Sequence, residues 1–155
     1  MTLAYQRADS TMTLGEGLAE YRLASPDLID PTRVEPGLAR FMRAHDRCHI
    51  VFGLDTSIRD EILADTWTLF GSDVAWREYS SYLRAPEVNN ILAEVGYWTL
   101  TVETARHLGD ILAARRHARR QHAKWPFWEG GAHLDRPLCE VRSTFGIQLV
   151  PRRGA

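Results

Sequence analysis

The chain has 155 residues, of which 45% are hydrophobic and 25% are charged, and its formal net charge is −1. This length and composition are typical of one globular domain over residues 1–155 with its own core, and they exclude collagen-like, disordered and disulfide-scaffold proteins. The near-zero net charge and the lack of a recognisable binding motif argue against nucleic acid as a partner.

Helical periodicity dominates the first half of the chain, and no alternating strand pattern with a hairpin turn occurs in the sequence. We expect residues 1–12 to be a flexible N-terminus and residues 13–23 to form a short amphipathic helix. A turn-rich connection leads to Pro36, which suits the first position of a helix because its missing N–H needs no partner there. That helix should stop at Gly53, and the next should run from Ile58 to Gly71.

Helical patterns continue through the second half of the chain. One segment carries Val74 to Leu83, and a longer helical stretch runs from residue 85 to about residue 123. That stretch is too long for one typical helix, so we expect a break near Gly96 or Gly109. A last helix is predicted over residues 137–145. These patterns indicate an all-α, single-domain bundle of about six or seven helices.

The residues that suggest chemistry lie near the end of the first long helix, in the sequence His45-Asp46-Arg47-Cys48-His49. His45 and His49 are four residues apart and therefore share one face of the helix, with Asp46 on its flank. Two imidazoles at this spacing can ligate one metal ion. The same spacing also suits two histidines on a semi-polar face, one of them packed in the core.

The following helix supplies carboxylates for the same site. A short link centred on Asp55 should make the two helices an antiparallel hairpin, in which position 49 faces Glu61 and position 45 faces Asp65. Four or five ionisable groups in one interface would be costly to bury without pairing or a metal. We therefore predict a metal site on the hairpin, holding one divalent transition metal (zinc, iron, manganese or cobalt) with open coordination positions.

The motif residues also carry a resemblance to a known family. His45-Asp46-x-x-His49, followed by eleven residues and then Glu61, resembles the HDxxH-x11-E signature of the Coq4 family of ubiquinone-biosynthesis proteins. The resemblance extends over roughly residues 15–150, because the family's closing pattern is similar to Lys124, Trp128-Glu129, Pro137-Leu138, Glu140-Val141-Arg142 and Gly146-Ile147.

The resemblance implies an all-helical fold in which His45, Asp46, His49 and Glu61 are the metal ligands. It also implies prenylated benzenoid substrates, a peripheral membrane location and association with other quinone-biosynthesis proteins. The implied reaction replaces the ring carboxylate at C1 by a hydroxyl, an oxidative decarboxylation. We therefore expect a metal-dependent decarboxylase or lyase in which Asp46 or Glu61 exchanges metal ligation for proton transfer. Asp65, which comes from the hairpin geometry and not from the motif, is a third catalytic candidate.

Two other functions are compatible with the same residues. One is a non-catalytic scaffold that binds prenyl lipids in a quinone-biosynthesis complex, with the metal as a structural staple. The other is a hydrolase or lyase of a natural-product pathway. Nucleophilic or nucleotide-driven chemistry has no support, because the sequence lacks a Ser-His-Asp order, a glycine-rich phosphate loop and a Cys-x-x-Cys pair.

Substrate contacts are predicted at two places outside the motif. The apolar stretch from Val88 to Leu112, including Trp98, either packs in the core or forms the wall of a tunnel for an isoprenoid tail. Arg142 either pairs with a carboxylate near the site or holds a substrate anion. A run of arginines forms either a solvated face or a contact with anionic lipid or nucleic acid, and it comprises Arg115, Arg116, Arg119 and Arg120.

The sequence has no apolar run long enough to span a membrane, and we expect neither a signal peptide nor a transit peptide. Two cysteines, Cys48 and Cys139, fit a reduced compartment. Cys48 points away from the histidine face and is expected to be a small core residue. We therefore expect a cytoplasmic protein, peripheral to the inner membrane if it contacts one. A homo-oligomer is compatible with the sequence.

Overall fold

The computed structural model describes residues 2–84 and 96–152, and within these ranges it is all-α, without a β-strand. Among the described residues, two 3-10 helices, Ala4–Gln6 and Gly130–His133, accompany seven α-helices. The α-helices are α1 (Leu14–Ala24), α2 (Pro36–Phe52), α3 (Ile58–Gly71), α4 (Trp76–Tyr82), α6 (Tyr97–Arg106), α7 (Leu108–Arg119) and α8 (Leu138–Phe145). The predicted fold class is confirmed.

Several helix ends lie where the local sequence signals predict them. Pro36 is the first residue of α2, and the carboxylate of Glu35 before it accepts hydrogen bonds from N–H groups of the first turn. Gly53 and Gly146 end α2 and α8 in the left-handed conformation, with φ angles of 71° and 67°. Glycine adopts this conformation without the steric penalty that a Cβ atom brings.

Other boundaries differ from the expectations. The long stretch breaks at His107, between α6 and α7, close to the predicted position at Gly109. The expected helix start at residues 85–87 lies outside the described residues. The N-terminal segment, expected to be flexible, packs against the core: Tyr5 is buried, and its hydroxyl donates a hydrogen bond of 2.8 Å to the carbonyl of Leu54.

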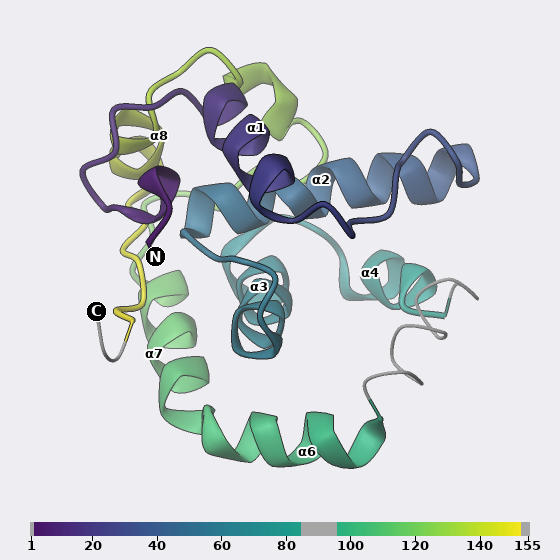
Figure 1. The fold of residues 1–155 in the computed structure, drawn as a ribbon. Helices are drawn as coiled ribbons and strands as arrows, with labels where there is room; N and C mark the ends of the chain where they lie inside the picture. The colour runs from purple at the N-terminus through teal and green to yellow at the C-terminus, as the bar shows by residue number, and fades with distance from the viewer. Residues whose placement is uncertain (1, 85–95, 153–155) are drawn as a thin grey trace.

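The core is built around α2 and α3. Figure 1 shows α2 extending across the molecule, with α1 and α8 on one side of it and α3, α4, α6 and α7 on the other. Phe52 of α2 stacks on Trp67 of α3, with ring centroids 4.4 Å apart and ring planes 8° from parallel. α1 packs on α2, and α7 packs along α3. Cys48 is buried in this core, as predicted.

α6 lies at the edge of the molecule (Figure 1) and carries part of an exposed apolar surface. Trp98 is 80% exposed, and exposed apolar side chains continue along α6 and α7 at Val102, Leu108 and Leu112. The prediction that the stretch from Val88 to Leu112 packs in the core is therefore wrong for these four side chains. Among the described residues, no helix combines the length and the apolar character needed to cross a membrane.

Candidate metal centre

Three of the predicted ligands converge at the interface of α2 and α3. The Nε2 atom of His49 lies 3.2 Å from Nε2 of His45. The Oε2 atom of Glu61 lies 3.6 Å from Nε2 of His45 and 3.4 Å from Nε2 of His49. Within residues 2–84 and 96–152, these three side chains are the group of His, Cys, Asp or Glu close enough to share one metal ion.

The spacing of the three ligand atoms fits a four-coordinate divalent ion. Tetrahedral bonds of about 2.0–2.1 Å to nitrogen and oxygen place neighbouring ligand atoms about 3.3–3.4 Å apart. The separations of 3.2, 3.4 and 3.6 Å lie on both sides of that value. Three protein ligands leave at least one coordination position open, which is typical of catalytic rather than structural zinc sites.

Hydrogen bonding and stacking orient His49 for ligation. Its side chain is 1% exposed, and Nδ1 lies 3.1 Å from the backbone carbonyl oxygen of Asp55. A carbonyl oxygen only accepts, so Nδ1 carries the proton and Nε2 directs its lone pair towards the other ligands. The imidazole also stacks on Tyr21, with ring centroids 5.2 Å apart. The tautomer and the ring rotation of His49 are therefore both set by its surroundings.

His45 is held mainly by packing. Its ring lies 5.9 Å from that of Phe41 and 11° from parallel to it, and Phe41 in turn stacks on Tyr82 at 4.5 Å. Nδ1 of His45 is buried and has no hydrogen-bond partner among the described residues. Nε2 faces His49 and Glu61, so this nitrogen is the one available to a metal.

The charges at the site shift two pKa values in opposite directions. Burial works to lower the pKa of His45, but the hydrogen bond and charge of Glu61, helped by Asp65 and Asp46, raise that pKa above its ordinary value of 6.5. Burial works to raise the pKa of Glu61, but the two imidazoles hold that pKa well below its ordinary value of 4.5. Without a metal, the group therefore favours a proton on His45 beside an ionised Glu61.

Asp46 lies beside the ligand group without joining it. Its side chain is largely buried, and Oδ2 lies 3.3 Å from Nη2 of Arg22 on α1. Successive residues of an α-helix are about 100° apart around its axis, so Asp46 does not share the face of His45 and His49. The structure thus brings together three of the four predicted ligands, and ligation by Asp46 stays a prediction.

Asp65 is close enough for its charge to raise the pKa of His45, but it also lies outside the ligand group. Its carboxylate accepts a hydrogen bond from the hydroxyl of Tyr79 on α4. Burial raises the pKa of Asp65 above its ordinary value, against the opposing charge of His45. A catalytic role for Asp65 stays a prediction.

Arg142 and Trp98, the two predicted substrate contacts, are not part of the metal centre. Arg142 is buried, and its guanidinium donates hydrogen bonds to backbone carbonyls of the N-terminal segment and the end of α2, namely Tyr5, Arg7, Ile50 and Val51. This corrects the expectation of an anion site at Arg142, because these bonds tie two chain segments together instead. Trp98 is exposed on α6, and a contact of Trp98 with substrate stays a prediction.

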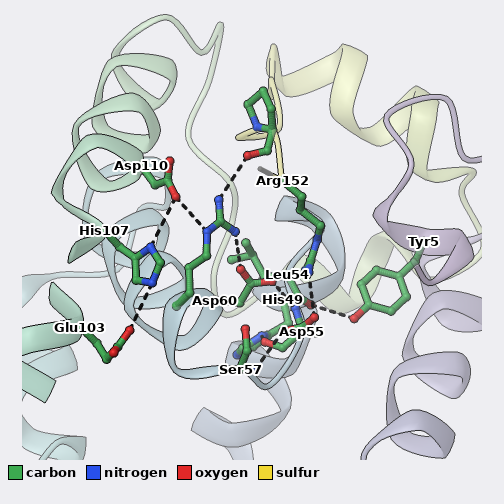
Figure 2. Close-up of polar contacts among 12 residues, drawn as sticks. Tyr5, His49, Leu54, Asp55, Ser57, Asp60, Glu103, His107, Asp110 and Arg152 are labelled. Atoms are coloured by element: carbon green, nitrogen blue, oxygen red, sulfur yellow. Dashed lines mark hydrogen bonds and ion pairs between the residues drawn. The ribbon is translucent and has the colours of Figure 1, made fainter. Parts of the chain in front are cut away.

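Sequence reasoning missed a buried ionic network next to the metal centre. Asp60 precedes Glu61 and bonds to Arg59 and Arg152, and Figure 2 shows the network continuing through Asp110 to His107. The adjacent opposite charges of Arg59 and Asp60 are the one local sequence feature that hints at this network. Arg152 is 92 residues away from Asp60, so no local pattern could reveal that pair.

We compared the chain with models of known protein families, with curated proteins and with solved structures, and none of the three comparisons found a match.

Proposed function

We propose that the chain is a metal-dependent enzyme of the Coq4 kind. Its substrate would be a prenylated hydroxybenzoate-type acid, and its reaction an oxidative decarboxylation with hydroxylation at C1. The bond from C1 to the carboxylate would break with release of CO2, water would supply the hydroxyl oxygen, and dioxygen would accept the two electrons and leave as hydrogen peroxide. The observation that carries the proposal is the convergence of His45, His49 and Glu61 at ligand spacing. A bound divalent ion would supply Lewis acidity and a template for the substrate's carboxylate or phenolic oxygen.

The residues of the chain would divide the work at this centre. The two imidazoles would hold the ion from the buried side, where Tyr21 packs against His49 and Phe41 packs against His45. Glu61 has a side chain that is 44% exposed, so it forms the accessible side of the centre. The carboxylate of Glu61 would therefore be the ligand best placed to give up metal ligation and accept a proton from the substrate.

Replacement of His49 tests the proposal. We expect the wild-type protein to bind one equivalent of zinc, iron, manganese or cobalt, and His49→Ala to lose both the metal and the turnover of a prenylated hydroxybenzoate in air. Elemental analysis and product mass spectrometry measure the two effects. His117→Ala is a matched control, because it also removes an imidazole whose Nδ1 contacts a backbone carbonyl, at 2.8 Å. Turnover by metal-free protein would refute the mechanism.

A separate observation favours the alternative of a lipid-binding scaffold. The exposed apolar side chains of α6 and α7 lie next to arginines, and one hollow on α7 is lined by Gly109, Leu112, Arg115, Arg116 and Arg119. Exposed tryptophan and leucine beside basic residues is typical of helices that lie in a membrane interface. In this alternative the protein docks on an anionic membrane and organises other quinone-biosynthesis proteins.

Vesicle sedimentation tests this alternative. We expect the wild-type protein to sediment with vesicles of phosphatidylglycerol and phosphatidylcholine and to bind pure phosphatidylcholine less. Leu108→Ser combined with Leu112→Ser should lower the bound fraction several-fold, because each leucine loses its apolar contact with the acyl chains. Leu23→Ser is the control, since Leu23 on α1 is a still more exposed leucine, at 85% against 53% for Leu108 and 47% for Leu112. Equal losses in the two variants would exclude α7 as the docking surface.

A further inference from the structure

A buried carboxylate lies one residue before a metal ligand without contacting the metal centre. Asp60 is 0% exposed. Its Oδ1 atom accepts a hydrogen bond of 2.6 Å from Nη1 of Arg59. Its Oδ2 atom accepts one of 2.8 Å from the backbone N–H of Asp55 and another from Nη2 of Arg152. Two guanidinium groups and one backbone N–H thus compensate for the burial of its charge (Figure 2).

Asp55 connects this buried carboxylate to His49. Its N–H is held by Asp60, and its own carboxylate accepts hydrogen bonds of 2.9 Å from the N–H of Ser57 and from Nη1 of Arg152. With these groups held, the carbonyl of Asp55 stays directed at Nδ1 of His49, at 3.1 Å. The carbonyl that determines the tautomer of His49 therefore belongs to a residue anchored at three other atoms.

We propose that Asp60 is a positioning residue for the metal centre and acts through Asp55 on His49, an inference that rests on the proposed metal binding. The link between α2 and α3 is only five residues long and contains no helix, so no helical hydrogen bonds hold its backbone in place. Without Asp60 and Arg152, the Asp55 carbonyl can rotate away, and His49 then loses the partner that keeps its proton on Nδ1. Loss of such an outer partner typically weakens metal affinity by about 10–100-fold.

The competing explanation is that the network only joins α3, α7 and the C-terminal segment. Asp110 of α7 separates the two explanations, because it is also a buried carboxylate bonded to Arg59, through Oδ2 at 2.9 Å. Asp60 accepts a hydrogen bond from the backbone N–H of Asp55, whereas Asp110 pairs with Arg59 and His107. If the network were purely structural, removal of either carboxylate would change the metal affinity to the same extent.

The test compares Asp60→Ala with Asp110→Ala by zinc titration against a competing chelator. We expect Asp60→Ala to weaken zinc affinity by about 10–100-fold and Asp110→Ala to leave it close to the wild-type value. Equal losses in both variants, or no loss in Asp60→Ala, would overturn the proposal. If Asp60→Ala does not fold, Arg152→Gln replaces it, because that variant removes the guanidinium that holds both Asp55 and Asp60. Unchanged zinc affinity in Arg152→Gln would count against the proposal in the same way.

A second measurement needs no metal. Long-range 1H–15N correlation spectra of the metal-free wild-type protein should show His49 protonated at Nδ1, and the folded Asp60→Ala or Arg152→Gln variant should show a mixture of tautomers. A wild-type His49 protonated at Nε2 would overturn the proposal. Failure of the wild-type protein to bind zinc, iron, manganese or cobalt would instead refute the proposed function, and the tautomer spectra would still decide whether Asp60 positions His49.

Discussion

Glu61 is the residue on which the chemistry of the metal-free centre depends. Its carboxylate contacts both imidazoles, and its charge is what keeps a proton on His45. A divalent ion needs the same Nε2 lone pair that this proton occupies. Metal binding and protonation of His45 are therefore mutually exclusive, and metal affinity must rise as the pH passes above the pKa of His45.

The same pair makes the stability of the metal-free protein depend on pH. The folded-state pKa of His45 is raised above 6.5, so its contribution is fully present below pH 6.5 and is lost as the pH rises through the folded-state value. The folded-state pKa of Glu61 lies below 4.5, so its contribution is present above pH 4.5 and is lost as the pH falls towards the folded-state value. The pair therefore stabilises the fold most between these two ordinary values.

Urea unfolding of metal-free wild-type protein and Glu61→Gln at several pH values measures this effect. The difference in the free energy of unfolding between the two proteins should be largest at about pH 5.5 and should shrink as the pH rises through the raised folded-state pKa of His45. A difference that stays constant over this range would show that the pair does not titrate as described.

At the scale of elements, the link between α2 and α3 determines where the ligands meet. Gly53 ends α2 at a φ angle of 71°, and the N–H of Leu54 donates a hydrogen bond of 2.7 Å to the carbonyl of His49. This sharp turn brings Asp55 back over the last turn of α2, within reach of the His49 imidazole. The turn and the metal centre therefore depend on the same few residues.

Gly53→Ala tests the turn. We expect a loss of about 1–2 kcal/mol in the free energy of unfolding, because a non-glycine residue is disfavoured at this φ angle and its Cβ would meet Cδ1 of Leu149 at 2.9 Å. Urea unfolding gives the value. Gly131→Ala is the matched control, since the nearest atom to its new Cβ is Nη1 of Arg47, at 3.8 Å. Similar losses in the two variants would contradict this account of the turn.

At the scale of the whole molecule, the two helices that carry the ligands are also held together by apolar packing. Phe52 stacks on Trp67 across the interface, and both side chains belong to the continuous buried core. α3 also packs on α7, which contributes none of the three metal ligands. The fold therefore has a source of cohesion that does not involve a metal.

Removal of the metal by a chelator should accordingly leave the helices intact, as judged by circular dichroism, and lower the stability only by the free energy of binding. At a metal concentration of 100 times the dissociation constant, that free energy is about 2.7 kcal/mol. Thermal unfolding with and without metal measures the difference. Complete unfolding on chelation would indicate a structural staple and would favour the scaffold function over the enzyme.

The sequence by itself determined the helical class, several helix ends and the shared face of His45 and His49. These features depend on start signals, stop signals and periodicity that act within a turn or two of one helix. The pairing of position 49 with Glu61 was also predictable, because both residues lie close to the link that joins their helices. The pairing of these two positions depends only on the helical turns that directly flank the link.

Only the tertiary structure decided the rest. Farther from the link, Glu61 rather than Asp65 meets His45, and Asp65 bonds to Tyr79 of α4 instead. Arg142 bonds to backbone carbonyls about 91 to 137 residues away, and Asp60 pairs with Arg152 from the C-terminal segment. The physical reason is common to these cases: a buried polar side chain bonds to whichever donor or acceptor the packed chain brings within about 3 Å. Periodicity along one helix carries no information about that neighbour.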